Sequence, residues 1–134
     1  MSKTEYQHEF VVALHDIDAA GVMFFAHLFR HAHDAYEAFM AELGLPLSEV
    51  IRQRRWLLPL VHAEADYRAP LRHGERIEVR LAVEDLGTSA FTLGYRFQDA
   101  AGNVRATAKT VHVHLAADGK GSAPLPQELR DALG

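Results

Sequence analysis

Hydrophobic residues recur at spacings of three and four between residues 24 and 43, which is the pattern of an amphipathic helix. Gly44 and Pro46 follow where such a helix would end, because glycine favours the C-terminal cap and proline cannot continue the helix. On the polar side, Arg30 stands one turn before Asp34, and we expect the two to pair. The pattern predicts one long helix from about Phe24 to Leu43. Its apolar stripe comprises Phe24, Leu28, Ala32, Tyr36, Phe39 and Leu43.

Alternating apolar and polar positions mark the strands in the rest of the chain. The clearest alternation lies in Ile77–Leu86, and Phe91–Asp99 repeats it. Pro59 stands near the start of the predicted strand Leu57–Arg68, which favours an edge of the sheet because proline cannot donate a ladder hydrogen bond. The remaining predicted elements are strands at Tyr6–Leu14 and Val104–Leu115, turns at 87–89 and 101–103, and short helices at Leu47–Arg54 and Pro126–Leu133.

The order of these elements is one strand, one long helix and then four strands. The last three strands are joined by short turns and must therefore form an antiparallel meander. We predict an α+β domain in which the helix lies on a five-stranded antiparallel sheet. Such a sheet has exposed edges, and a small domain often covers them by pairing with a copy of itself, so we expect a homodimer.

Composition narrows the class of protein. The chain has 134 residues, 49% of them hydrophobic, which predicts a single domain over residues 1–134 with a real core. A net charge of -4 without a basic stripe argues against a nucleic-acid partner. Cysteine is absent, which excludes thiolate chemistry and suits a reducing cytoplasm. Met1–Glu5 is polar, and no apolar run is long enough for a bilayer, so we expect a cytoplasmic protein without a membrane partner.

The stretch His15–Val22 joins the first strand to the long helix and holds two acids, Asp16 and Asp18. Either acid could simply cap a turn, but one is enough for capping. The first turn of the helix offers free N–H groups and the positive end of a dipole, which can hold an oxyanion on a carbonyl. An acid just before that turn could attack a carbonyl or activate a water, and the sequence leaves both roles open. Gly21 allows the backbone to bend.

Nine histidines raise the question of a metal. His27 and His31 share a helix face, but there is no HExxH pattern, and a pair of histidines is too few for zinc. We therefore predict no metal. His62 shares a strand face with Glu64 and is either an ordinary hydrogen-bonded histidine or a substrate contact. Residues 53–55 are polar and expected to be exposed, and the aromatic residues Phe24, Phe25 and Trp56 are expected in the core or in the lining of a substrate pocket.

Two segments resemble a known family. The first is Asp16-x-Asp18-x-x-Gly21-Val22-x-Phe24-x-x-x-Leu28, followed by Glu37; the second is Leu60–Leu71, followed by Gly74-Glu75. Together they resemble hotdog-fold acyl-CoA thioesterases of the 4-hydroxybenzoyl-CoA thioesterase type, over nearly the whole chain. Within this family, residues 18–22, 25–27 and 61–64 are similar to 1,4-dihydroxy-2-naphthoyl-CoA thioesterases of quinone biosynthesis.

The resemblance implies a hot-dog fold, in which a five-stranded antiparallel sheet wraps around one long central helix, assembled as a dimer or tetramer. It implies hydrolysis of an aromatic acyl-CoA, either 1,4-dihydroxy-2-naphthoyl-CoA or a 4-hydroxybenzoyl-CoA-like thioester, to free acid and CoA without a cofactor. It assigns the catalytic carboxylate to Asp18 and the oxyanion contact to the backbone amide of Phe25. The substrate-binding residues that we expect are Gly21, Val22, His27, His62, Thr88 and Ser89.

The chain departs from the family pattern at two places. Phe25 stands where many short-chain relatives carry histidine, and Thr88 and Ser89 stand where one branch has basic residues for the CoA phosphates. Turn formation is the other interpretation of Thr88 and Ser89. The alternatives for the whole protein are a broad short- or medium-chain acyl-CoA or acyl-carrier-protein thioesterase, and a non-catalytic acyl-CoA-binding module. A hotdog hydratase is disfavoured because position 23 is Met23 rather than histidine.

Overall fold

A computed structural model describes residues 5–134 as five strands, three α-helices and one short 3-10 helix. The strands form one antiparallel sheet in the order β1-β3-β4-β5-β2. This arrangement confirms the predicted α+β class and the meander of β3, β4 and β5. The elements are β1 (Tyr6–Val11), η1 (Leu14–Asp16), α1 (Phe25–Glu42), α2 (Leu47–Arg52), β2 (Leu60–Tyr67), β3 (Arg76–Leu86), β4 (Ala90–Gln98), β5 (Val104–Val113) and α3 (Gln127–Leu133).

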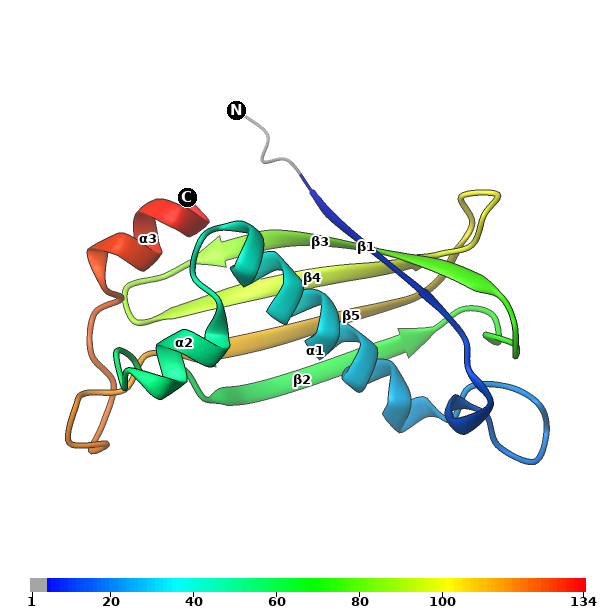
Figure 1. The fold of residues 1–134 in the computed structure, drawn as a ribbon, viewed down its shortest axis with the longest axis horizontal. Helices are drawn as coiled ribbons and strands as arrows, with labels where there is room; N and C mark the ends of the chain where they lie inside the picture. The colour runs from blue at the N-terminus through cyan, green and yellow to red at the C-terminus, as the bar shows by residue number, and fades with distance from the viewer. Residues whose placement is uncertain (1–4) are drawn as a thin grey trace.

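Helix α1 lies across one face of the sheet, and α2 and α3 lie near the end of the sheet that is remote from the start of α1 (Figure 1). The core forms between α1 and the inward positions of the strands. The alternation predicted in β3 and β4 is confirmed, because the inward apolar positions from Ile77 to Leu81 and from Phe91 to Phe97 are buried and the polar positions between them are not. Val83, further along β3, is half-buried. The buried residues that meet are Leu28, Ala32, Ala35, Tyr36 and Met40 of α1, Ile77, Val79 and Leu81 of β3, and Phe91, Leu93, Tyr95 and Phe97 of β4.

Several boundaries differ from the prediction: β2 begins at Leu60 instead of Leu57, β5 ends at Val113 instead of Leu115, and α2 ends at Arg52 instead of Arg54. Two further differences lie next to the junction of β1 and α1. Strand β1 ends at Val11 instead of Leu14, because Leu14–Asp16 turns into a 3-10 helix that the Asp16 carboxylate closes by accepting the Ala13 N–H at 2.9 Å. Phe24 is the N-cap residue of α1 and is 44% exposed, so it does not belong to the buried stripe. These two differences at the junction arise because the local turn satisfies the hydrogen bonds of its own backbone groups. The spacing of apolar residues carries no information about such hydrogen bonds.

Strand β2 is an edge strand, as Pro59 predicted. Seven of its eight positions are exposed, and only Ala65 is half-buried. An uncovered edge with apolar side chains such as Val61, which is 57% exposed, is a typical place for pairing with another chain. Within residues 5–134, no helix is both long and apolar enough to cross a membrane. The prediction about the polar N-terminus falls mostly on residues 1–4, which lie outside the described residues.

Candidate active site

The segment between β1 and α1 forms a small hairpin that carries both acids of the motif. Ile17 bridges Met23, the Asp18 N–H donates to the Val22 carbonyl at 2.9 Å, and the Phe24 N–H donates to the Asp16 carbonyl at 2.9 Å. Gly21 closes the turn by donating its N–H to the Asp18 carbonyl at 3.0 Å, with a φ of 82° that favours glycine. The hairpin therefore holds Asp18 at its tip, directly before α1. We call residues 16–25 the acid corner.

Asp16 is the buried acid of the acid corner, with none of its side chain exposed. Its carboxylate accepts the Ala13 N–H, pairs with the Arg30 guanidinium, and lies 3.1 Å from His31 Nε2. Burial alone would raise the pKa of this carboxyl, but hydrogen bonds from Ala13 and His31 and the nearby charges outweigh it and lower the pKa. Asp16 thus ties the end of β1 to α1.

The partner of Arg30 differs from the prediction. Its guanidinium pairs with Asp16, and within residues 5–134 it forms no ion pair with Asp34. Arg30 and Asp34 share a helix face, but a surface pair of this kind contributes only about 0.3 kcal/mol. The buried carboxylate of Asp16 needs a cation far more, because an unpaired buried charge is costly.

Asp18 has the opposite surroundings and is exposed. One of its oxygens, Oδ1, accepts the Ala20 N–H at 2.8 Å. No contact within the described part of the chain occupies the other oxygen. The same carboxylate can therefore stabilise the turn and still present one oxygen to a substrate or a water.

The first turn of α1 leaves backbone donors unused. Phe24 supplies no side-chain cap, and the first turn contains no acid. Among residues 5–134 the N–H groups of Phe25 and Ala26 have no acceptor. Two free donors at the positive end of an 18-residue helix are suited to an anion or an oxyanion.

A tyrosine from the edge strand fixes this turn. The Tyr67 hydroxyl donates to the Phe25 carbonyl oxygen at 3.0 Å, and partial burial raises the pKa of Tyr67 to about 12. The bond joins the end of β2 to the residue whose N–H is predicted to meet the thioester carbonyl. Sequence analysis did not single out Tyr67, because its contact with Phe25 spans two elements.

The other predicted site residues fall into two groups. Gly21 and Val22 lie in the acid corner, and His27 follows in the first turns of α1, with its ring centroid 6.0 Å from that of Phe24. His62 lies exposed on β2 with Nε2 3.1 Å from Glu64 Oε1. These contacts leave both interpretations of His62 open.

Thr88 and Ser89 lie apart from the acid corner within one chain. Strand β3 begins beside Val11, next to the corner, and runs 11 residues before the turn that holds them. Their carbonyls accept N–H groups from Leu125 and His114 at 2.8 Å. In a single chain, Thr88 and Ser89 are therefore turn residues, and their role in binding stays a prediction.

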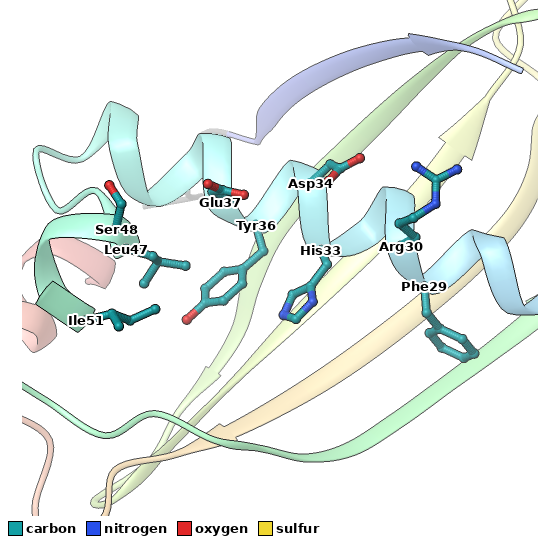
Figure 2. Close-up of a pocket in the computed structure, with 9 residues that line it drawn as sticks. All are labelled: Phe29, Arg30, His33, Asp34, Tyr36, Glu37, Leu47, Ser48 and Ile51. Carbon is teal, nitrogen blue, oxygen red and sulfur yellow. The ribbon is translucent and has the colours of Figure 1, made fainter. Parts of the chain in front are cut away.

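A groove of about 700 Å³ runs between α1 and α2, and sequence analysis missed it. Figure 2 shows Phe29, His33 and Tyr36 projecting from one side of α1, with Leu47 and Ile51 of α2 beside Tyr36. The rings of His33 and Tyr36 stack with centroids 5.8 Å apart. This α1–α2 groove has the size of a small-molecule site and aromatic walls.

The histidines do not gather into a metal site within residues 5–134, where no three His, Asp or Glu side chains could hold an ion. His112 is buried between Tyr36 and Phe91, and burial lowers its pKa to about 4, helped by the nearby His33. His114 contacts the Pro124 carbonyl through Nδ1 at 2.8 Å.

An exposed acid in the turn that precedes free helix N–H donors, on a sheet curled against one helix, is the arrangement expected for a hotdog thioesterase. The family model of the thioesterase-like superfamily matches residues 12–133, and the chain belongs to this family. A relative from Synechococcus elongatus, named 1,4-dihydroxy-2-naphthoyl-CoA hydrolase, is 41% identical over 130 residues, which cover 96% of this chain and 95% of the relative.

Solved structures agree with this assignment. A 1,4-dihydroxy-2-naphthoyl-CoA thioesterase from Synechocystis matches with a TM-score of 0.90 and 34% identity, over 96% of this chain and 95% of that one. A gentisyl-coenzyme A thioesterase matches with a TM-score of 0.83 and 28% identity, over 95% and 98% of the two chains. The hot-dog fold predicted from the sequence is confirmed.

Proposed function

We propose that this protein hydrolyses a hydroxylated aromatic acyl-CoA, 1,4-dihydroxy-2-naphthoyl-CoA or a close analogue, to the free acid and CoA. The observation that carries the proposal is the acid corner, where the exposed Asp18 carboxylate precedes two unused helix N–H donors. The names of the relatives support the acyl group and a role in quinone biosynthesis. We also propose that the protein acts in the cytoplasm.

In the proposed reaction, the thioester carbonyl oxygen lies at the Phe25 N–H, which stabilises the negative charge that develops there. Asp18 either attacks the carbonyl carbon or takes a proton from an attacking water. If Asp18 attacks, the C–S bond breaks to leave an acyl anhydride on Asp18, which water then hydrolyses to free the acid and restore the carboxylate. If Asp18 acts as the base, the water adds to the carbonyl carbon directly and the C–S bond breaks from that adduct. On either route CoA leaves as the thiolate and takes up a proton, so that water and thioester yield acid and thiol. Because a thiolate leaves readily and backbone donors hold the oxyanion, we propose that the reaction needs no metal or other cofactor.

The α1–α2 groove is the proposed site of the acyl group. It begins near the acid corner at Phe29 and Arg30, and Arg30 also contacts Asp16. Aromatic rings favour a flat aryl group. The Tyr36 hydroxyl, which has no hydrogen-bond partner within residues 5–134, is available to a hydroxyl of the acyl ring.

We also propose that two copies pair through β2, which fits the exposure of Val61 and of Phe25, 57% and 62% respectively. Light scattering tests this proposal, since a dimer has twice the 14.9 kDa mass of the chain. Val61→Asp places a charge on this exposed edge and should shift the mass toward that of the monomer. A monomeric parent protein would contradict the pairing.

A substrate panel with detection of free thiol tests the activity. It compares 1,4-dihydroxy-2-naphthoyl-CoA and 4-hydroxybenzoyl-CoA with butyryl-CoA and octanoyl-CoA. We expect kcat/KM to be at least about tenfold higher for the best aromatic substrate, as a shaped pocket can provide. Faster hydrolysis of the aliphatic thioesters would refute the aromatic assignment, and dialysis against EDTA should leave the rate unchanged.

A further inference from the structure

A second groove lies at the opposite end of β2 from the acid corner. It has a volume of about 770 Å³ and lies between the end of α2, the approach to β2 and the segment after β5. The residues that matter here are Ile51, Arg54, Arg55, Trp56, Leu57 and His114, and we call it the Arg54 groove. Ile51 and Leu57 are 71% and 46% exposed, so the groove is both apolar and basic.

The charge of the Arg54 groove stands out in an acidic protein. Three of the 14 basic residues fall within residues 52–55, whereas the whole chain has a net charge of -4. Arg52 pairs with Glu49, and Arg55 pairs with Glu128. The Arg54 guanidinium has no carboxylate partner within residues 5–134, so its charge is the one available to a ligand.

The backbone of Arg54 gives an independent reason to assign it a role. Arg54 follows the C-cap residue Gln53 of α2 and has a φ of 54°, in the left-handed region, where it is the single non-glycine residue among those described. The Arg54 N–H donates to the Ile51 carbonyl at 3.1 Å and the Arg55 N–H to the Val50 carbonyl at 3.0 Å, which defines a Schellman cap. Glycine is preferred at that position. An arginine in this conformation is less stable than a glycine would be. Its guanidinium forms no hydrogen bond or ion pair within residues 5–134, so the fold itself gives no reason for an arginine at this position.

An aromatic wall completes the groove. The Arg55 guanidinium lies 4.4 Å from the centroid of the Trp56 ring, which keeps the indole in place beside Arg54. A cation next to an indole and apolar side chains suits a ligand that carries both phosphate and a purine ring. On the proposed function, the substrate has such an end, the phosphoadenosine part of CoA.

We propose that the Arg54 groove binds the phosphoadenosine end of CoA, and that it does so for the acid corner of the partner subunit. Within one chain, the eight residues of β2 separate the groove from Tyr67 and Phe25 by about 27 Å at ~3.4 Å per residue. Antiparallel pairing of β2 with its copy brings the Leu60 end of one strand toward the Tyr67 end of the other. The substrate then has its acyl group in the α1–α2 groove of one chain and its nucleotide on the other chain.

The test replaces Arg54 by glycine, which suits the backbone and should leave the melting temperature unchanged or higher. Arg54→Gly should raise KM for the acyl-CoA about tenfold with kcat unchanged, the usual size of a lost charge-assisted hydrogen bond. The same acyl group on pantetheine, which lacks the phosphoadenosine, should show no change. Arg52→Ala is the matched control, because it removes a charge already paired with Glu49 and should change KM less than about twofold.

Calorimetry with free CoA makes the test independent of turnover. CoA should bind Arg54→Gly about tenfold more weakly than the parent protein. Equal affinities, or an equal rise of KM for acyl-CoA and acyl-pantetheine, would overturn the proposal. If the parent protein binds CoA through Arg54 but hydrolyses no thioester, the proposed function fails and the groove assignment stands.

A mixed dimer tests which subunit the groove serves. A heterodimer of one Asp18→Asn chain and one Arg54→Gly chain has a single intact Asp18, whose partner subunit keeps Arg54. We expect it to hydrolyse acyl-CoA with the KM of the parent protein. A KM equal to that of the Arg54→Gly homodimer would show that the groove serves its own chain.

Discussion

The two acids of the acid corner are separated by one residue and have opposite surroundings. Asp16 is fully buried and contacts Ala13, Arg30 and His31, whereas Asp18 is exposed and accepts one hydrogen bond from Ala20. A buried carboxylate with both oxygens engaged stabilises a fold but cannot reach a substrate. Asp18, the acid that folding leaves free, is therefore the candidate for chemistry, and the contacts of Asp16 hold the turn that carries it in place.

The largest expected effect follows from removing the free acid. Asp18→Asn keeps the size of the side chain and the hydrogen bond to Ala20, but loses the charge and the nucleophile or base. Because positioned acid–base groups contribute typically about 10²–10⁴-fold, we expect kcat to fall about 10³-fold. Steady-state kinetics measure kcat, and the melting temperature shows whether the variant is folded. A loss of turnover that is caused by unfolding would not support a catalytic role for Asp18.

Removing the buried acid should instead act on stability. Asp16→Ala leaves Arg30 and the Ala13 N–H without their partner, and we expect a loss of about 3 kcal/mol in the free energy of unfolding. Urea denaturation at pH 7.5 measures it. The lowered pKa of Asp16 adds a second signature, since its stabilisation is present above the unfolded pKa of about 3.9 and is lost as the pH falls through the lower folded pKa. An Asp16→Ala variant that is as stable as the parent protein would contradict the structural role assigned to Asp16.

Acid also weakens the fold through His112, and this effect must be separated from that of Asp16. Burial lowers the pKa of His112 to about 4, so the unfolded chain takes up the proton first as the pH falls below its unfolded value of about 6.5. Stability should therefore fall by about 2–3 kcal/mol between pH 7.5 and 4.5. His112→Gln has no proton to take up and should flatten that part of the stability profile. An unchanged slope in this variant would assign the acid sensitivity to other groups.

The smallest expected effect concerns Tyr67, which holds the first turn of α1 through the Phe25 carbonyl. A neutral hydrogen bond of this kind contributes about 1 kcal/mol, so Tyr67→Phe should lower kcat about fivefold. KM should stay within about twofold, because Tyr67 is a positioning residue and the substrate contacts remain. A change in KM alone would show that Tyr67 contacts substrate and does not position the turn.

The sequence predicted the fold correctly where the spacing of apolar residues identified both a strand and the side of it that faces the core. In β3 and β4 each inward side chain is apolar, so the alternation of Ile77, Val79 and Leu81 was enough. The acid corner was also found from the sequence, through its two acids and Gly21. The family resemblance carried the hot-dog fold, which residue spacing alone did not imply.

Features that join distant segments were not predictable in this way. The Arg30–Asp16 pair, the Tyr67–Phe25 hydrogen bond and both grooves bring together residues from different elements. Residues 53–55 were expected to be exposed and polar, and nothing in their pattern placed Arg54 beside a groove. The cluster of basic residues before Trp56, namely Arg52, Arg54 and Arg55, was the available signal. The roles of Asp18, His27, His62, Thr88 and Ser89 stay predictions.

The most direct test of the account is a single-turnover experiment with Asp18→Asn in excess over 1,4-dihydroxy-2-naphthoyl-CoA. The account predicts that this variant binds the intact thioester about as tightly as the parent protein does, and releases free thiol at least about 10³-fold more slowly. Release of thiol at the rate of the parent protein, from a folded variant with bound substrate, would contradict the assignment of the chemistry to Asp18.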